Sequence, residues 1–272
     1  MVELIIGMLL LSIIGLAIVR VITSQTRYFE RQKTAVQARS ISRGPLNRIV
    51  SDLRMVEAVG GILAASDSSV LVRVPYAMGV VCANVAGNTH VSLLPVDSAM
   101  YDSPGFSGYA WRPGNGVYRY VETGPPLIDF LGDINVCNIA LVSTLLLNNA
   151  KVVRISPALV DTASVGTPIF LFRRIRYWFG PSPTIPGTRG LFRTVVETGA
   201  TEELAAPFEA AAKFRFFVLS SRVPQAVPPN DLSTLRGVQF VLDGTSERIP
   251  TGAVTRQRAP FTTAVYFKNR PQ

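Results

Sequence analysis

The sequence predicts an α+β fold, in which a long N-terminal transmembrane and amphipathic α-helix precedes a β-rich head. Three observations support this prediction. An almost uninterrupted apolar run begins near the N-terminus, helically spaced apolar residues continue beyond it, and short β-branched and aromatic runs fill the remaining sequence. The 272 residues are enough for a long anchor and one large head.

The first element is an apolar helix. Residues Leu4 to Val19 are apolar apart from Ser12, and the distance from Leu4 to Ile22 in a helix is about 28 Å, close to one hydrocarbon core. A cleaved signal peptide is the alternative. It would have a basic start, a shorter apolar core and a small-residue cleavage site, and the sequence has none of these. We therefore expect a retained membrane anchor.

An amphipathic pattern extends the helix. Apolar residues recur at helical spacing on a polar background, at Ile22, Phe29, Val36, Ile41, Leu46, Ile49, Leu53 and Val56. Gly44-Pro45 predicts a kink or break, and Gly60-Gly61 predicts the stop. We expect one rod over about residues 2–58, with its rear half against the head. The expected domains are 1–60, the membrane-anchoring helix, and 61–272, the β-rich head.

The head is expected to consist mainly of strands separated by Gly, Pro, Asn and Asp. The candidates are Val70–Val74, Gly79–Val85, His90–Val96, Val117–Glu122, Asn138–Leu147, Lys151–Ser156, Pro168–Phe179, Arg189–Glu197, Lys213–Ser220, Val238–Leu242 and Thr262–Phe267. Residues 97–116 are expected to form a long ordered loop, and Glu202–Ala212 a short helix broken at Pro207. Residues 168–179 and 189–197 are expected to form a hairpin.

The charge is basic and dispersed. The formal net charge is +9, yet beyond the N-terminal helix the longest basic cluster is Arg173-Arg174-Ile175-Arg176. A dispersed excess argues against a nucleic-acid groove. It fits contact with anionic lipid or an acidic partner, or a generally basic surface.

Few residues suggest site chemistry. Cys82 and Cys137 are expected to form a disulfide if the head is exported, and two buried free thiols are the alternative. The only histidine, His90, is expected in a strand or turn. No phosphate-binding loop, nucleophile elbow or zinc motif occurs, so we expect no enzyme, catalytic residue, cofactor or metal.

The segment Met1-Val2-Glu3-Leu4-Ile5-Ile6-Gly7 resembles the prepilin N-terminal motif. Glu3 matches the family's glutamate if two residues precede Met1, and the resemblance implies that it docks a subunit by pairing with a neighbour's amino terminus. An interfacial acid favoured by the helix dipole is the other interpretation of Glu3. Asp52-Leu53-Arg54-Met55, and more weakly residues 235–242 and 261–269, resemble minor pilins of the PilW and PulJ kind.

This resemblance implies a non-enzymatic structural subunit, a minor pilin or pseudopilin of a type IV pilus or type II secretion system. It implies a single pass through the bacterial inner membrane, a periplasmic head, and other membrane-embedded subunits and the lipid bilayer as partners. Arg20, Arg27 and Arg31 follow the span, and charge alone would place the head in the cytoplasm. In pilins a removed leader supplies the opposing charge, so either the chain is a processed or trimmed form, or it is a pilin descendant that no longer polymerises.

The alternative is a co-opted accessory subunit that stabilises another membrane complex, for example a respiratory or photosynthetic one, on its periplasmic side. The sequence does not decide between a filament and such a complex, and it gives neither the stoichiometry nor the strand order. We do not expect nucleic acid as a partner.

Overall fold

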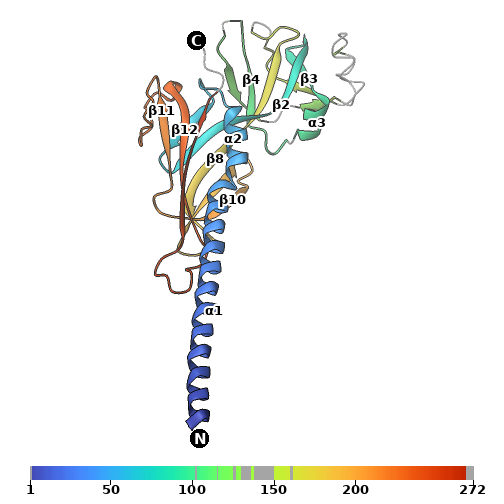
Figure 1. Cartoon of the computed structure of the whole chain (residues 1–272). Helices are drawn as coiled ribbons and strands as arrows, with labels where there is room; N and C mark the ends of the chain where they lie inside the picture. Colours follow the sequence, from blue (N-terminus) through green and yellow to red (C-terminus); the bar gives the residue numbers. More distant parts are fainter. Residues whose placement is uncertain are drawn as a thin grey trace.

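A computed structural model describes residues 2–101, 103–114, 116–124, 127–129, 136–137, 150–159 and 162–267. A helical stalk carries an antiparallel β-sheet head near its upper end (Figure 1). Helix α1, Val2–Arg43, has 42 residues and is therefore about 63 Å long. The predicted long N-terminal helix followed by a β-rich region is confirmed.

The predicted interruption at Gly44-Pro45 separates two helices. Helix α1 ends at Arg43, and α2, Leu46–Arg54, begins immediately after Pro45. Proline lacks the amide hydrogen that a continuous helix needs at this point, which explains the break. Helix α2 ends with the Met55 amide donating to the Asp52 carbonyl oxygen at 3.2 Å.

In the part of the head that the structure describes, 13 strands form one sheet with the main order β11-β12-β10-β9-β8-β2-β3-β7-β6. Strand β13 pairs with β12, β1 with β2, and β4 with β5 and β8. The remaining elements are β1 Ile62–Ser66, β2 Ser69–Val85, β3 Asn88–Leu93, α3 Pro95–Met100, β4 Gly108–Trp111, β5 Arg119–Glu122, β6 Leu127–Asp129, β7 Val152–Ile155, β8 Pro168–Pro181, β9 Arg189–Val195, β10 Thr201–Phe208, β11 Lys213–Val218, the 3-10 helix η1 Leu232–Thr234, β12 Leu235–Thr245 and β13 Arg258–Tyr266.

Strands β2 and β8 connect two hydrophobic cores. They pair antiparallel from Ser69 opposite Trp178 to Val80 opposite Pro168. One core lies under α2 and includes Ile49, Leu53, Val72, Ile175 and Phe240, whereas the second includes Val81, Leu93, Tyr109, Val153 and Leu171. Alternate residues of a strand point to opposite faces, which explains why Val70, Val72 and Val74 are buried together.

The predicted short helix Glu202–Ala212 is wrong. Residues Thr201–Phe208 form strand β10, which pairs with β9 from Thr201 opposite Thr194 to Phe208 opposite Arg189. The segment is rich in Glu, Leu and Ala, which favour helices, but the hairpin with β9 supplies backbone partners and buries Phe208. Here pairing with a neighbouring strand overrides local propensity.

The other differences concern boundaries. The expected loop 97–116 contains strand β4 and the end of α3, and residues 69–85 form one strand where two were predicted. Strand β3 ends at Leu93, before the predicted Val96, because Pro95 starts α3. The predicted strand Asn138–Leu147 lies outside the described residues. The hairpin of 168–179 with 189–197 is confirmed by the pairing of β8 with β9.

Candidate anchoring and assembly helix

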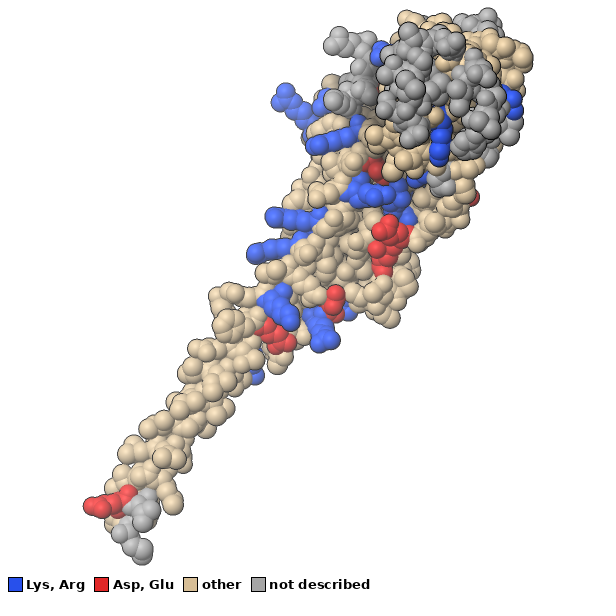
Figure 2. Space-filling model, turned by 90° about the vertical axis from the view of Figure 1, so that its right-hand side faces the viewer, with Lys and Arg blue, Asp and Glu red and all other residues tan. Residues whose placement is uncertain are grey.

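The first two thirds of α1 form an exposed apolar surface. Every side chain described between Val2 and Phe29 is exposed, including Leu9, Leu11 and Ile14. Figure 2 shows this part of the rod almost uniformly free of charge, with basic and acidic side chains gathering where the head begins. Among the described residues, this is the helix that is long and apolar enough to cross a membrane.

The rear part of α1 docks on β12 and β13 through small residues. Thr34, Ala38 and Ser42 are buried and lie four residues apart, so they share one face of the helix. The Ser42 hydroxyl donates to the carbonyl oxygen of Ala259 at 2.8 Å and accepts from the amide of Gly244 at 3.1 Å. One hydroxyl therefore links α1 to two adjacent strands.

Gly244 permits this close approach. A β-carbon at residue 244 would collide with the Ser42 Oγ atom and lie 2.7 Å from the carbonyl oxygen of Ala38. Sequence reasoning did not identify Ser42 or Gly244 as functional. Gly244 lies beyond the predicted strand Val238–Leu242 but inside the observed strand β12, and a glycine inside a strand often marks a place where another backbone comes close.

A second face of α1 remains unpaired with the head. Phe29 and Val36 belong to the predicted amphipathic pattern, yet their side chains are 66% and 62% exposed. With Ile22 they recur every seven residues, which places them on one stripe of the helix. We call Ile22, Phe29 and Val36 the heptad stripe. It points away from the docked face and continues the apolar surface past the end of the apolar run.

A buried polar cluster fixes α2 to the sheet. The Tyr177 hydroxyl on β8 donates to Asp52 Oδ2 on α2 at 2.5 Å, and Arg193 Nε on β9 donates to the same oxygen at 3.3 Å. Burial, followed by the neighbouring Asp52 carboxylate, raises the pKa of Tyr177 well above its ordinary value. The hydroxyl therefore stays protonated and keeps donating, which holds α2 and the stalk in a defined orientation.

Glu3, the predicted assembly residue, lies in the first turn of α1 and is exposed. It is far along the stalk from the docked residues Thr34, Ala38 and Ser42. Its pairing with a neighbouring subunit stays a prediction.

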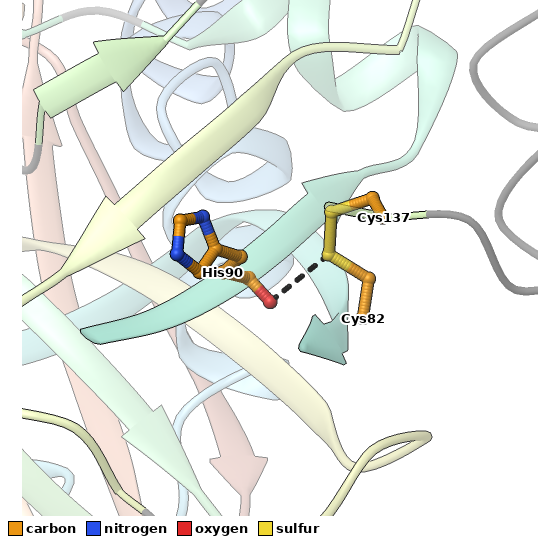
Figure 3. The surroundings of a disulfide bond; sticks show 3 residues. All are labelled: Cys82, His90 and Cys137. Atoms are coloured by element: carbon orange, nitrogen blue, oxygen red, sulfur yellow. Dashed lines mark hydrogen bonds between the residues drawn. A yellow bond between two sulfur atoms is a disulfide. The ribbon is translucent and has the colours of Figure 1, made fainter. Parts of the chain in front are cut away.

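The structure joins Cys82 and Cys137 by a disulfide, with the two Cα atoms 5.0 Å apart. Figure 3 shows the carbonyl oxygen of His90 directed at the Cys82 sulfur, 3.2 Å away. His90 itself is a buried residue of β3, as expected of a strand residue. The bond closes a separation of 55 residues and ties β2 to a distant part of the chain.

No catalytic arrangement of side chains is evident among the described residues. No group of three His, Cys, Asp or Glu side chains gathers there as a metal site. A hollow of about 670 Å³ near β8 and β10 is lined by residues that include Arg189, Glu209 and Arg256. Its two hydroxyl residues, Thr188 and Thr245, donate to the backbone carbonyl oxygens of Ile185 and Pro207. The expectations of no enzyme, cofactor or metal stay predictions.

Comparison of the chain with models of known protein families, with curated proteins and with solved structures finds no match. The arguments about function therefore depend on the residues and geometry of this chain.

Proposed function

We propose that this protein is a non-enzymatic structural subunit, anchored in a membrane by α1 and assembled through α1 with other membrane-embedded subunits. The heptad stripe is the observation that carries the proposal. A helix that served only as an anchor would have no need of large apolar side chains at Phe29 and Val36, beyond the apolar run and beside the head.

The free-energy cost of exposing apolar surface to water supports the membrane anchor. Exposed apolar surface costs about 25 cal/mol per Å² in water, and α1 exposes Ile5, Leu9, Leu11 and many similar side chains. Contiguous apolar surfaces of this kind mark membrane or protein contacts. A bilayer relieves the cost over the length of the apolar run, because a helix satisfies its own backbone hydrogen bonds.

The resemblance of residues 1–58 to prepilin-type helices supports a more specific role. We propose a minor pilin or pseudopilin of a type IV pilus or type II secretion system, with its head on the periplasmic side of a bacterial inner membrane. The Cys82–Cys137 disulfide supports export, because disulfides persist in oxidising compartments. Glu3 would then take part in docking between subunits.

Partner identification tests the proposal. Full-length tagged protein is extracted from native membranes in mild detergent, and the co-purifying proteins are identified by mass spectrometry. We expect pilus or secretion subunits, and we expect the Phe29→Glu, Val36→Glu double variant to lose them. Both positions are exposed, so the free energy of unfolding should change by no more than about 0.5 kcal/mol per substitution.

Val223→Glu is the matched control, since Val223 is an equally exposed valine in the head. It should retain every partner. If the double variant keeps the same partners as the unmodified protein, assembly through the heptad stripe is wrong. Recovery in fixed ratio with subunits of a respiratory or photosynthetic complex would support the accessory-subunit alternative and exclude the pilus assignment.

A further inference from the structure

The loop 246–257 between β12 and β13 is the part of the head that reaches furthest down the stalk (Figure 1). Its Thr251 amide donates to Glu30 Oε2 on α1 at 3.2 Å. A β-carbon on Gly252 would lie 3.9 Å from Arg27 Cζ. These two contacts place the loop beside α1, just above the apolar run.

The loop exposes apolar side chains together with basic ones. Val254 is 93% exposed and Ile249 is 51% exposed, and Arg248 next to Ile249 is exposed as well. Among the described residues, Val254 is the most exposed large apolar side chain. Apolar tips flanked by arginine are typical of segments that rest in the interface of an anionic bilayer.

The position along α1 matches the headgroup layer. The distance along the helix from Ile22, the end of the apolar run, to Arg27 is about 8 Å. The headgroup layer is about 5–8 Å thick on each side of the hydrocarbon core. Arg27 therefore lies at the outer edge of this layer, and the loop beside it faces the lipid surface.

Three arginines of α1 lie on the same side as the loop. Arg20, Arg27 and Arg31 line one shallow hollow on the helix surface, and all three are exposed. Arg31 is two residues beyond Phe29, about 200° around the helix, so these arginines lie opposite the heptad stripe. Ala38, seven residues after Arg31, belongs to the docked face, which places the arginines beneath the overhanging head.

We propose that Arg20, Arg27 and Arg31 of α1, with Arg248, Ile249 and Val254 of the loop, form a second membrane contact that binds an anionic lipid surface. We call these six residues the collar. The proposal rests on the membrane anchoring proposed above. Arg20, Arg27 and Arg248 bind lipid phosphates, and the two apolar side chains enter the headgroup layer. Arg31, about 14 Å beyond Ile22, adds positive charge just above that layer.

The collar gives the head a fixed orientation on the membrane. Transmembrane helices tilt by about 20° on average, and a tilt towards the loop brings Ile249 and Val254 closer to the hydrocarbon core. Because the collar lies on one side of α1, it favours that direction of tilt. The heptad stripe on the other side then turns away from the lipid surface and is presented to a partner subunit.

A depth measurement tests the collar. Full-length protein carrying Val254→Cys, labelled with an environment-sensitive fluorophore, is reconstituted in vesicles whose lipid headgroups bear nitroxide quenchers. The vesicles contain phosphatidylcholine alone or with about one third phosphatidylglycerol. The native cysteines are buried in their disulfide, so only the new thiol reacts. Val227→Cys, an exposed valine at the opposite end of β12, is the reference position, and Ile249→Cys is a second test position.

We expect strong quenching at residues 254 and 249 in the anionic vesicles and little at residue 227. Replacing Arg27→Gln or Arg248→Gln should shift the equilibrium of loop contact by about fivefold each, corresponding to about 1 kcal/mol per arginine near an anionic surface. Arg222→Gln, between β11 and η1, should not change the quenching.

If the protein floats with the vesicles but residues 254 and 249 are quenched no more than residue 227, the collar alone is overturned. A protein that does not float with the vesicles would overturn both the anchor and the collar.

Discussion

Gly244 controls how closely α1 approaches the sheet. Its missing side chain leaves room for the carbonyl oxygen of Ala38 and for the Ser42 hydroxyl, which accepts the Gly244 amide hydrogen. The contact is small in area but it bridges β12 and β13, since Ser42 also donates to Ala259. One glycine and one serine therefore fix the stalk at the point where it meets the head.

We predict that Gly244→Ala lowers the free energy of unfolding by about 1–3 kcal/mol, because the added methyl group must displace α1 from the sheet. Urea unfolding of the full-length protein in detergent, followed by tryptophan fluorescence, measures the change. Gly114→Ala is the control, since no heavy atom lies within 4 Å of a β-carbon there and the residue is exposed. Equal stability of the two variants would contradict the close contact.

At the scale of elements, the disulfide connects β2 to a part of the chain that lies 55 residues later. A covalent link of this length restricts the unfolded chain far more than the folded one. Cys82 lies next to the His90 carbonyl oxygen of β3, and the two cysteines form a small buried cluster of their own with Val152 of β7. The disulfide thus adds a covalent constraint to this packed cluster.

We predict that reduction of this disulfide lowers the free energy of unfolding by about 2–4 kcal/mol. The measurement compares urea-unfolding midpoints of the full-length protein with and without reductant, while thiol labelling reports the state of the cysteines. The Cys82→Ser, Cys137→Ser double variant should show the lower midpoint and no response to reductant. Thiols that label in the folded protein without reductant would show that the bond is absent.

The sequence predicted the long helix, its break at Pro45 and many of the strands, because apolar periodicity and proline act locally. It could not predict which face of α1 docks, since the buried residues Thr34, Ala38 and Ser42 are small and carry little hydrophobic signal. It also misassigned Thr201–Phe208, whose strand conformation depends on β9. The amphipathic pattern included Phe29 and Val36 and was expected to place the rear half of the helix against the head, but both side chains are exposed.

At the scale of the whole molecule, the two sides of α1 have different surroundings. One side carries the arginines, the loop 246–257 and the docked residues, and so faces the head and, by our proposal, the lipid surface. The other side carries the heptad stripe and is open. This division follows from one helix with a head attached on one side, and it leaves the heptad stripe open to another helix.

The most direct test of the proposed assembly function is photo-crosslinking in native membranes. A photoreactive amino acid replaces Phe29 or Val36 in the full-length protein, and Val223 in the control, since all three are exposed. We predict crosslinks from residues 29 and 36 to a helix of another membrane-embedded subunit, or of a second copy of this chain, and none from residue 223. If residues 29 and 36 crosslink to lipid alone, or to proteins no more than residue 223 does, the proposal that α1 assembles this protein into a complex is wrong.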